Sequence, residues 1–318
     1  MQSSTKLINL NSLNATKVNG SFNSSLLFNF RGIIVPDPTI DHITISVHNA
    51  QIPCSFYNVN VYNNILAISL NGGSTTILTL TRGNYNANTL ITEILAQLTA
   101  HSITSISIII SATTGKLQFI ITSGYFTLFY ATSTIFSILG LIPTQNYTSS
   151  SQSLIPDYPC NLLGILKLKV ASNTLQTNSI DSSIGGSLSI LSCIPVESGT
   201  FGIILYDNVT KTDYNLNLTI LDGFDIQILD DVNNLVNFNG IDFTISLLIT
   251  TFQSDKTITT FNDILNKPIA ELPPISPDSE PAAPPPNVDT NYDLQTDNAF
   301  MPDPSTMDDL DILLYNNH

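Results

Sequence analysis

The residues best suited to chemistry in this sequence are four aspartates that fall close together, Asp222, Asp225, Asp230 and Asp231. Carboxylates on neighbouring turns can bind calcium, which takes about six to eight oxygen ligands. The same stretch continues with Asn233 and Asn234, and clustered Asp and Asn are typical of a hairpin turn. We therefore expect a turn here, with a calcium site as the alternative. As a general acid and base, these carboxylates lack a companion His or Lys.

Histidines and cysteines form no ligand set in the sequence. His42 and His48 share one predicted strand at even spacing, so they are interpreted as residues of a strand face, and His101 and His318 stand alone. The cysteines lack CxxC spacing, and we expect buried thiols without disulfides at Cys54, Cys160 and Cys193. Phosphate-binding glycine loops and a nucleophile elbow are also missing. The sequence therefore predicts no enzyme, no cofactor and no metal.

Charge is sparse and acidic. Charged residues make up 11% of the chain, against roughly 25% in ordinary soluble domains. The net charge is -15, and the ten Lys and Arg are scattered. Nucleic-acid binding needs a concentrated basic surface, so we expect no direct contact with nucleic acid. The start, MQSSTKLINLN, lacks the features of a signal peptide, and the apolar runs are too short to span a bilayer.

Composition divides the chain into zones. Residues 1–20 are polar and are interpreted as an N-terminal arm. Residues 21–70 and 159–258 contain β-branched and aromatic runs separated by Gly, Asn, Asp and Pro, among them SFYNVNVYN and ILAISL. Residues 71–158 mix helical and strand patterns. We therefore predict a mainly β protein, a single jelly-roll β-sandwich with an inserted α+β domain, because eight strands in two sheets is the jelly-roll count.

The insertion contains the clearest local signals. Asn88 or Thr89 is the expected N-cap of a helix whose apolar residues recur at helical spacing: Leu90, Ile91, Ile94, Leu95 and Leu98. A hairpin is expected to turn at Thr114-Gly115. A short helix in STIFSILGLIP is expected to end at Gly140.

The last zone, residues 267–318, holds ten of the 17 prolines and ten of the 25 acidic residues. Such a segment cannot bury enough apolar surface to fold, so we predict a disordered, Pro-rich acidic tail. Near its end the tail carries an apolar motif, and such a motif on a flexible acidic segment is typical of a docking peptide. The residues of this motif are Met307, Leu310, Leu313, Leu314 and Tyr315. The alternative is a solvated tail without a partner.

Four stretches together resemble the vertex (penton) and minor capsid proteins of virophages, polinton-like viruses and related large DNA viruses. They are HNAQIPCSFYNVN (48–60), RGNYNANTLITEILAQL (82–98), FSILGL (136–141), and the pair ILSCIPV (190–196) with ILDDVNNLVNFNGIDFTISLLI (228–249). The resemblance covers residues 25–258 and leaves the tail outside.

The resemblance implies a jelly roll whose inserted domain faces outward, while five copies close an icosahedral vertex. The expected partners are therefore the chain itself, as a homopentamer, and the major capsid protein. Another virion protein could bind the C-terminal tail. The expected location is the virion, after synthesis in the host cytoplasm.

Two other functions stay open. The first is a minor or cement protein of the same capsid. The second is a receptor- or glycan-binding spike that uses exposed aromatic residues of the insertion, namely Tyr85, Tyr125 and Tyr130. These aromatic side chains could instead pack the core of the insertion. A secreted hydrolase is disfavoured because a signal, a base and a nucleophile are all missing.

Overall fold

The computed structural model describes residues 2–253, apart from 19–21, 35–36, 38, 178, 182–185, 188, 211 and 217–220. The predicted tail at 267–318 lies outside the described residues, and so does the predicted docking motif at 307–315. Both stay predictions.

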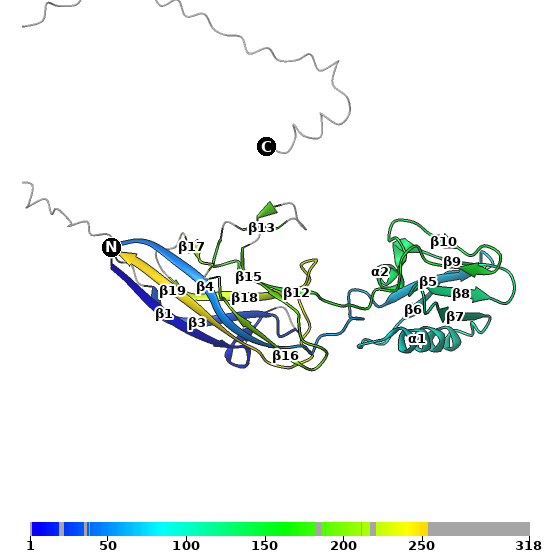
Figure 1. Ribbon diagram of the computed structural model, residues 1–318, viewed down its shortest axis with the longest axis horizontal. Coiled ribbons are helices and arrows are strands. Elements are labelled where there is room, and N and C mark those ends of the chain that lie inside the picture. Colours follow the sequence, from blue (N-terminus) through cyan, green and yellow to red (C-terminus); the bar gives the residue numbers. More distant parts are fainter. Residues whose placement is uncertain are drawn as a thin grey trace, which may run out of the picture. The chain divides into compact units, whose positions relative to one another are not determined.

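Two antiparallel sheets form a β-sandwich (Figure 1). The first has the order β1 (Gln2–Asn11), β19 (Thr244–Gln253), β4 (Ile40–Pro53) and β16 (Ile203–Asp207), and β17 (Tyr214–Leu216) also pairs with β4. The second has the order β15 (Ile190–Pro195), β12 (Lys167–Ala171), β18 (Leu221–Leu229), β3 (Ser25–Ile34) and β2 (Thr16–Lys17). A short 3-10 helix, Ser12–Asn14, follows β1, and β13 (Ile180–Asp181) pairs with β14 (Gly186–Ser187). The prediction of a mainly β protein is confirmed.

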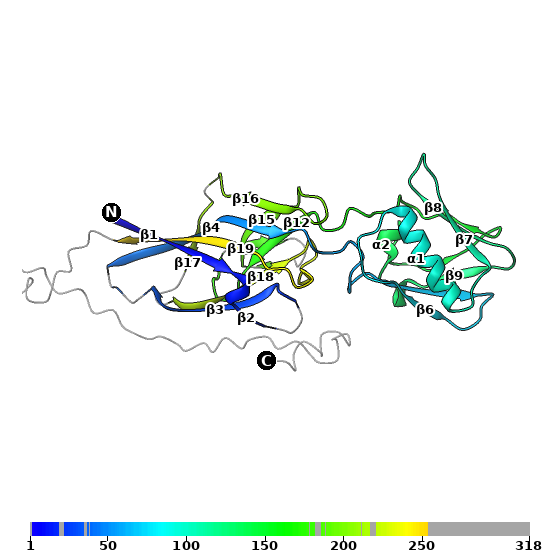
Figure 2. The same cartoon turned by 90° about the horizontal axis from the view of Figure 1, so that it is seen from below.

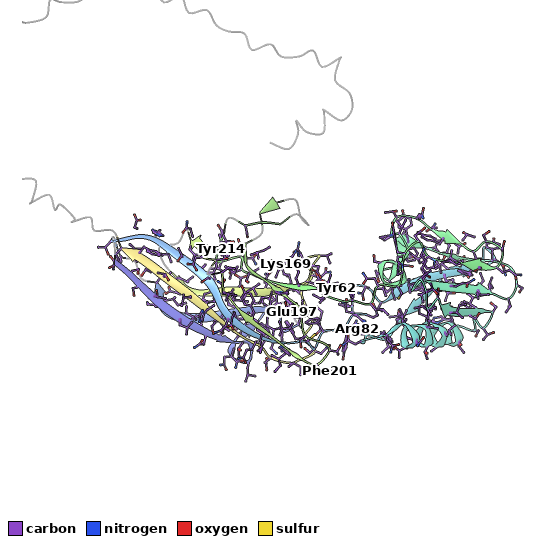
Figure 3. The ribbon with its side chains drawn as sticks, in the orientation of Figure 1. Tyr62, Arg82, Lys169, Glu197, Phe201 and Tyr214 are labelled. Atoms are coloured by element: carbon purple, nitrogen blue, oxygen red, sulfur yellow. The ribbon has the colours of Figure 1, made fainter. Side chains whose placement is uncertain are left out.

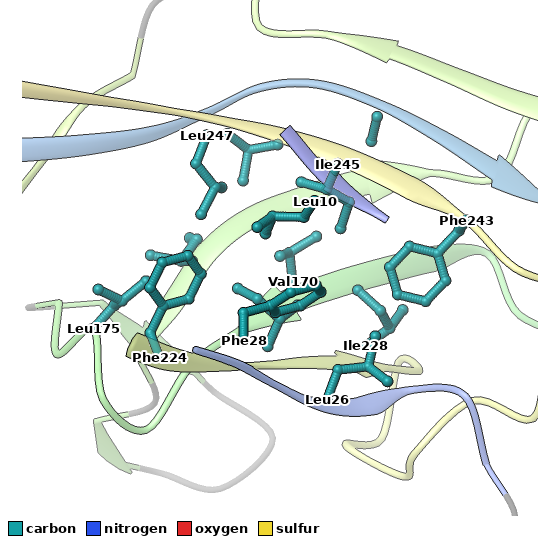
Figure 4. Close-up of a cluster of buried hydrophobic side chains, with 14 of the residues drawn as sticks. Leu10, Leu26, Phe28, Val170, Leu175, Phe224, Ile228, Phe243, Ile245 and Leu247 are labelled. Atoms are coloured by element: carbon teal, nitrogen blue, oxygen red, sulfur yellow. The ribbon is translucent and has the colours of Figure 1, made fainter. Parts of the chain in front are cut away.

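The core of the sandwich arises from residues that alternate along the strands. On β18, Phe224, Ile226 and Ile228 are fully buried, whereas the residues between them are only partly buried. Figure 4 shows side chains of the two sheets meeting between the layers, with Phe28 and Phe224 from one sheet and Ile245 and Leu247 from the other. The two phenylalanine rings lie 6.2 Å apart. Because side chains alternate between the two faces of a strand, the apolar residues of both sheets point into one shared core.

The predicted N-terminal arm is wrong for residues 2–11, which form β1. This strand pairs with β19 over ten consecutive residues, from Gln2 with Gln253 to Asn11 with Thr244. Leu10 anchors it, because its side chain is 2% exposed in the sandwich core. The other side chains are mostly polar and exposed. A polar strand at a sheet edge gives little hydrophobic signal, so composition alone suggests an arm.

A second hydrophobic core belongs to the α+β unit and runs from Val59 to Leu154. One sheet has the order β10 (Tyr147–Thr148), β9 (Phe126–Leu128), β5 (Ile65–Leu70) and β6 (Thr76–Thr79), and the other has β11 (Ser153–Leu154), β8 (Leu117–Ile121) and β7 (Ile106–Ile110). Two α-helices, α1 (Ala87–Ala100) and α2 (Phe136–Leu139), and the 3-10 helix Tyr130–Thr132 complete it. ILAISL was predicted for the sandwich, but it is β5, which pairs with β6 and β9.

The predicted strand SFYNVNVYN is also wrong, since residues 55–63 form loops and turns. Asparagine side chains take the place of a strand ladder here. The Asn58 side chain accepts from Tyr85 N at 2.9 Å and donates to Tyr85 O at 2.9 Å and to Leu162 O at 3.2 Å. These bonds join the segment that leaves the sandwich to the one that returns to it. Amide side chains satisfy the backbone groups, so a β-like composition gives an irregular segment.

The local predictions within the α+β unit are largely confirmed. The hairpin between β7 and β8 turns at Gly115, whose φ is +66°. The short helix α2 ends at Gly140, whose φ is +77° and whose added Cβ would lie 2.1 Å from the carbonyl oxygen of Tyr158. The N-cap of α1 is two or three residues earlier than predicted, at Asn86 rather than Asn88 or Thr89. Asn86 and Thr89 bond to each other's backbone as a capping box, which fixes the start.

We expect Asn86→Ala to destabilise the α+β unit by about 1 kcal/mol, because N-cap removal leaves backbone donors of the first helical turn unsatisfied. Asn88→Ala is the matched control, because the residue lies inside the helix and is not the cap. We expect it to change stability by less than about 0.5 kcal/mol. Chemical denaturation followed by circular dichroism measures both. Equal losses in the two variants would contradict this assignment of the cap.

Candidate assembly surface

The four aspartates do not converge on one site, and even the adjacent Asp230 and Asp231 accept from different backbone groups. Asp222 accepts from Gly32 N at 3.3 Å, whereas Asp225 accepts from Thr174 N, which belongs to a different loop. Asp230 Oδ1 accepts from Val232 N and Asn234 N at 2.9 and 2.8 Å, and Asn233 has a φ of +68°. The predicted turn at 230–234 is confirmed, with Asp230 as the acceptor that closes it. Within the described ranges, no three His, Cys, Asp or Glu side chains gather as metal ligands would.

Asp225 holds the loop that follows β12. Its carboxylate accepts from the backbone N–H of Asn173 and Thr174 and from the hydroxyls of Ser172 and Thr174, at 2.8 to 3.0 Å. Burial, the largest single influence, raises the pKa of Asp225, but the four hydrogen bonds together outweigh it and hold the pKa below its ordinary value. The group therefore acts as a structural anion.

Lys169 lies on the outer face of the second sheet, opposite Cys193, and stabilises the neighbouring turn. Its side chain is 2% exposed, and Nζ donates to the backbone oxygen of Asp231 at 3.1 Å and to Asn233 Oδ1 at 2.8 Å. A buried ammonium group needs such acceptors, because an unsatisfied buried charge is very costly. The carboxylates that sequence reasoning weighed for calcium therefore accept from backbone N–H groups, and Lys169 binds the backbone oxygen of Asp231.

The histidines and cysteines are dispersed. His42 stacks on Phe252 with centroids 4.3 Å apart, and His48 is exposed at a bulge of β4. None of the three cysteines forms a disulfide. Cys54 is buried, and burial raises the pKa of the half-buried Cys160 to about 11. The prediction of a buried thiol is wrong for Cys193, which lies on the outward face of β15.

The three aromatic residues considered for receptor binding differ in exposure. Tyr85 is half-buried against the core of the α+β unit, and its hydroxyl donates to Thr81 O at 2.6 Å. Tyr125 and Tyr130 are exposed, on either side of β9. Their backbone N–H groups are held by Asn71 and Asn146. The role of the three residues in receptor binding stays a prediction.

An unusual surface lies at the edge of the first sheet, where β16 pairs with β4 and with no other described strand (Figure 2). Cys54 N donates to Gly202 O, and Asn208 N donates to His48 O, both at 2.9 Å. Because bonded and non-bonded pairs alternate in an antiparallel ladder, the backbone groups of Ile203 and Leu205 face away from β4. They are unpaired in the part of the chain that is described, and they form an open edge.

This edge is apolar on both faces. Ile204 is buried in the core, while Ile203 and Leu205 are 62% and 74% exposed on the other face. The neighbouring strands carry polar residues on that outer face, such as Gln51 opposite Leu205. Sheet edges are usually protected by charge, by Pro or by a cover. We call Phe201, Ile203 and Leu205, with the open backbone of β16, the β16 surface.

Phe201 extends the β16 surface beyond the strand. Its side chain is 81% exposed and its φ is +65°, an uncommon conformation for a bulky residue. Its N–H donates to Cys54 O at 2.9 Å, which holds the backbone in place. Phe201 and Glu197, labelled in Figure 3, come from the loop between β15 and β16. Strain that places an aromatic ring in solvent is typical of a functional contact.

Sequence reasoning missed this surface, although a signal exists. The run FGIILY places apolar residues on both faces of one strand, a pattern typical of strands buried on both sides. The sequence cannot show that such a strand lies at an edge, and only that position turns the run into an exposed surface.

A helix long and apolar enough to cross a membrane is not found in the part of the chain that the structure describes.

The chain is therefore a mainly β protein, with a β-sandwich, an α+β unit and an apolar open edge. No family model matches it, and no curated protein matches it. Solved structures similar to it include the mavirus penton protein, with 13% sequence identity over 78% of this chain and 100% of that chain, and a TM-score of 0.43. A likeness at this level carries no inference about function, which is argued below from the chain's own residues.

Proposed function

We propose that this chain is a non-enzymatic structural protein of a viral capsid, a vertex protein whose copies close a five-membered ring. The observation that carries the proposal is the β16 surface, which combines an open sheet edge with exposed apolar side chains. An exposed apolar edge on an isolated chain would aggregate, so it requires a cover. In an assembly, a neighbouring copy or capsomer supplies that cover.

Strand order supports the jelly-roll form of the sandwich. Taken along the chain, β1, β4, β16 and β19 fall in one sheet and β3, β12, β15 and β18 in the other. Their spatial orders are β1-β19-β4-β16 and β3-β18-β12-β15. Eight of the strands, four in each of the two five-stranded sheets, are interleaved as in two Greek keys. In the chain the α+β unit lies between β4 and β12, and its core begins at Val59, earlier than the predicted insertion of residues 71–158.

The two edges of the first sheet differ from each other, which supports assembly into a ring. The first sheet ends at β1, whose outward residues are mostly polar, and at β16, which is apolar. A closed ring needs two different surfaces on each copy, because every contact joins one face to another. The number five, and contact with a major capsid protein, come from the resemblance to vertex and minor capsid proteins of residues 48–60, 82–98, 136–141, 190–196 and 228–249. Virion location follows from the same proposal.

The receptor-binding spike is the second candidate. It is favoured by the exposure of Tyr125 (43%) and Tyr130 (40%) on the α+β unit, since Tyr is common at recognition surfaces. It is compatible with the capsid proposal, because one virion protein can perform both functions.

Native mass spectrometry and sedimentation of the purified full chain test the capsid proposal. We expect a species of five copies that dissociates on dilution. A chain that stays monomeric up to about 100 μM, alone and with capsid shells, would overturn the proposal, since stable rings need tighter association. A trimer, or a monomer that binds only preformed shells, would replace the vertex role by that of a minor or cement protein.

A further inference from the structure

The open edge of β16 has the requirements of a strand acceptor. Ile203 and Leu205 direct backbone N–H and C=O groups away from β4, at the spacing that an added strand pairs with. A groove of about 300 Å³ runs beside them, lined by Pro195, Glu197, Ser198, Ile203, Ile204, Leu205 and Tyr206. Strand addition of this kind combines main-chain hydrogen bonds with pockets for alternate side chains.

The charge of the groove selects the segment that fits it. Its lining holds one acidic residue, Glu197, and no Lys or Arg, and Asp207 lies at the end of the strand. Among the stretches with apolar residues after β19 are 256–261 (KTITTF) and 307–315 (MDDLDILLY). The second carries three aspartates and would be repelled. The first carries one lysine and consists otherwise of Thr, Ile and Phe, residues that favour strands.

The length of chain between β19 and residue 256 determines whether the same copy or another copy can supply this segment. Gln253, the last residue of β19, pairs with Ile40, whereas Asp207 of β16 pairs with Asn49. Asn49 is nine residues further along β4, which corresponds to about 30 Å. The three residues from Gln253 to position 256 span at most about 11 Å. The segment therefore cannot lie along β16 of its own copy, and β17 occupies the nearer part of the β4 edge.

We propose that residues 256–261 of one copy add as a strand to the β16 edge of a second copy. The inference rests on the proposed function in that it requires self-association, and it names the occupant of the β16 surface. The added strand covers Ile203 and Leu205, pairs their backbone groups, and brings Lys256 near the acidic groove. Each copy both gives and receives a strand, so the contact is heterologous and can continue around a ring.

Disulfide trapping tests the contact directly. One tagged chain carries Leu205→Cys, and a second chain with a different tag carries a cysteine at position 257, 258, 259 or 260 in turn. Both chains also carry Cys193→Ser, which removes the exposed native thiol. Residues opposite each other on paired strands are close enough for a disulfide. We expect at least one position to link the two chains after mild oxidation. The matched control is Ser4→Cys on the open edge of β1, which should not link.

Two truncations separate this inference from the proposed function. A chain ending at residue 266 keeps the segment and should associate like the full chain. A chain ending at Gln253 should associate at least roughly tenfold more weakly, because it loses the added strand. Undiminished association of the shorter chain, or disulfides that form only within single chains, would overturn the strand exchange and leave the capsid proposal standing. Failure of the full chain to associate at all would overturn both.

Discussion

Ile203→Lys combined with Leu205→Lys will leave the chain folded but weaken its self-association by at least about a hundredfold. Burying one large aliphatic side chain contributes about 1.5–3 kcal/mol, and each factor of ten in affinity corresponds to about 1.4 kcal/mol. Both side chains are exposed in the single chain, so the free energy of unfolding should change by less than about 0.5 kcal/mol. Sedimentation equilibrium measures association, and thermal unfolding of the dissociated protein measures stability.

The matched control replaces two other exposed isoleucines, Ile77 on β6 and Ile109 on β7, by lysine. Their exposure is similar, at 52% and 51%, but they belong to the α+β unit. We expect the control to associate like the wild-type chain. Unchanged association in the β16 variant, or an equal loss in the control, would show that the β16 surface is not the assembly surface.

Asp225→Ala will destabilise the sandwich by about 2–3 kcal/mol. The substitution removes the acceptor of two backbone N–H groups and two hydroxyls, and hydrogen bonds to a charged group are among the stronger ones. Asp222→Ala is the control on the same strand, because Asp222 is exposed and accepts one bond at 3.3 Å. We expect that control to change stability by less than about 0.5 kcal/mol. Equal effects in denaturant titrations would contradict the role of Asp225.

The same carboxylate predicts a pH dependence with a definite sign. The pKa of Asp225 is lowered in the folded chain, so its ionised form stabilises the fold. That contribution is fully present above the ordinary pKa of an aspartate, about 4. It is lost as the pH falls through the lowered value in the folded chain. The stability difference between wild type and Asp225→Ala should therefore be constant near neutral pH and shrink in acid. A difference that grows in acid would contradict the assignment.

Local signals predict the α+β unit well. The start of α1 depends on Asn86 and Thr89, three residues apart, and the hairpin and α2 depend on glycines with positive φ. Such features need only neighbours in the chain. The position of the N-cap was misjudged by two or three residues, because Asn86, Asn88 and Thr89 are all good caps and only the hydrogen bonds distinguish them.

Strand membership is harder to predict. Ile65–Leu70 has the composition of a sandwich strand, but its partners are β6 and β9. SFYNVNVYN has β-forming residues, but its Asn58 side chain donates to the distant backbone oxygens of Tyr85 and Leu162. In both cases the deciding contacts include residues far apart in sequence, such as Ile68 with Leu128 and Asn58 with Leu162, which periodicity cannot report.

By itself, the amino-acid sequence determined a mainly β chain with sparse charge and an α+β segment between two groups of strands, because propensity, turn residues and composition act locally. Tertiary structure alone decided that residues 2–11 pair with β19 and that Cys193 faces outward. It also decided that β16 lies at an edge and exposes Ile203 and Leu205. The physical reason is that a strand lies at an edge when no other strand pairs with one of its sides. Strand pairing depends on contacts between residues as distant in sequence as Gln2 and Gln253.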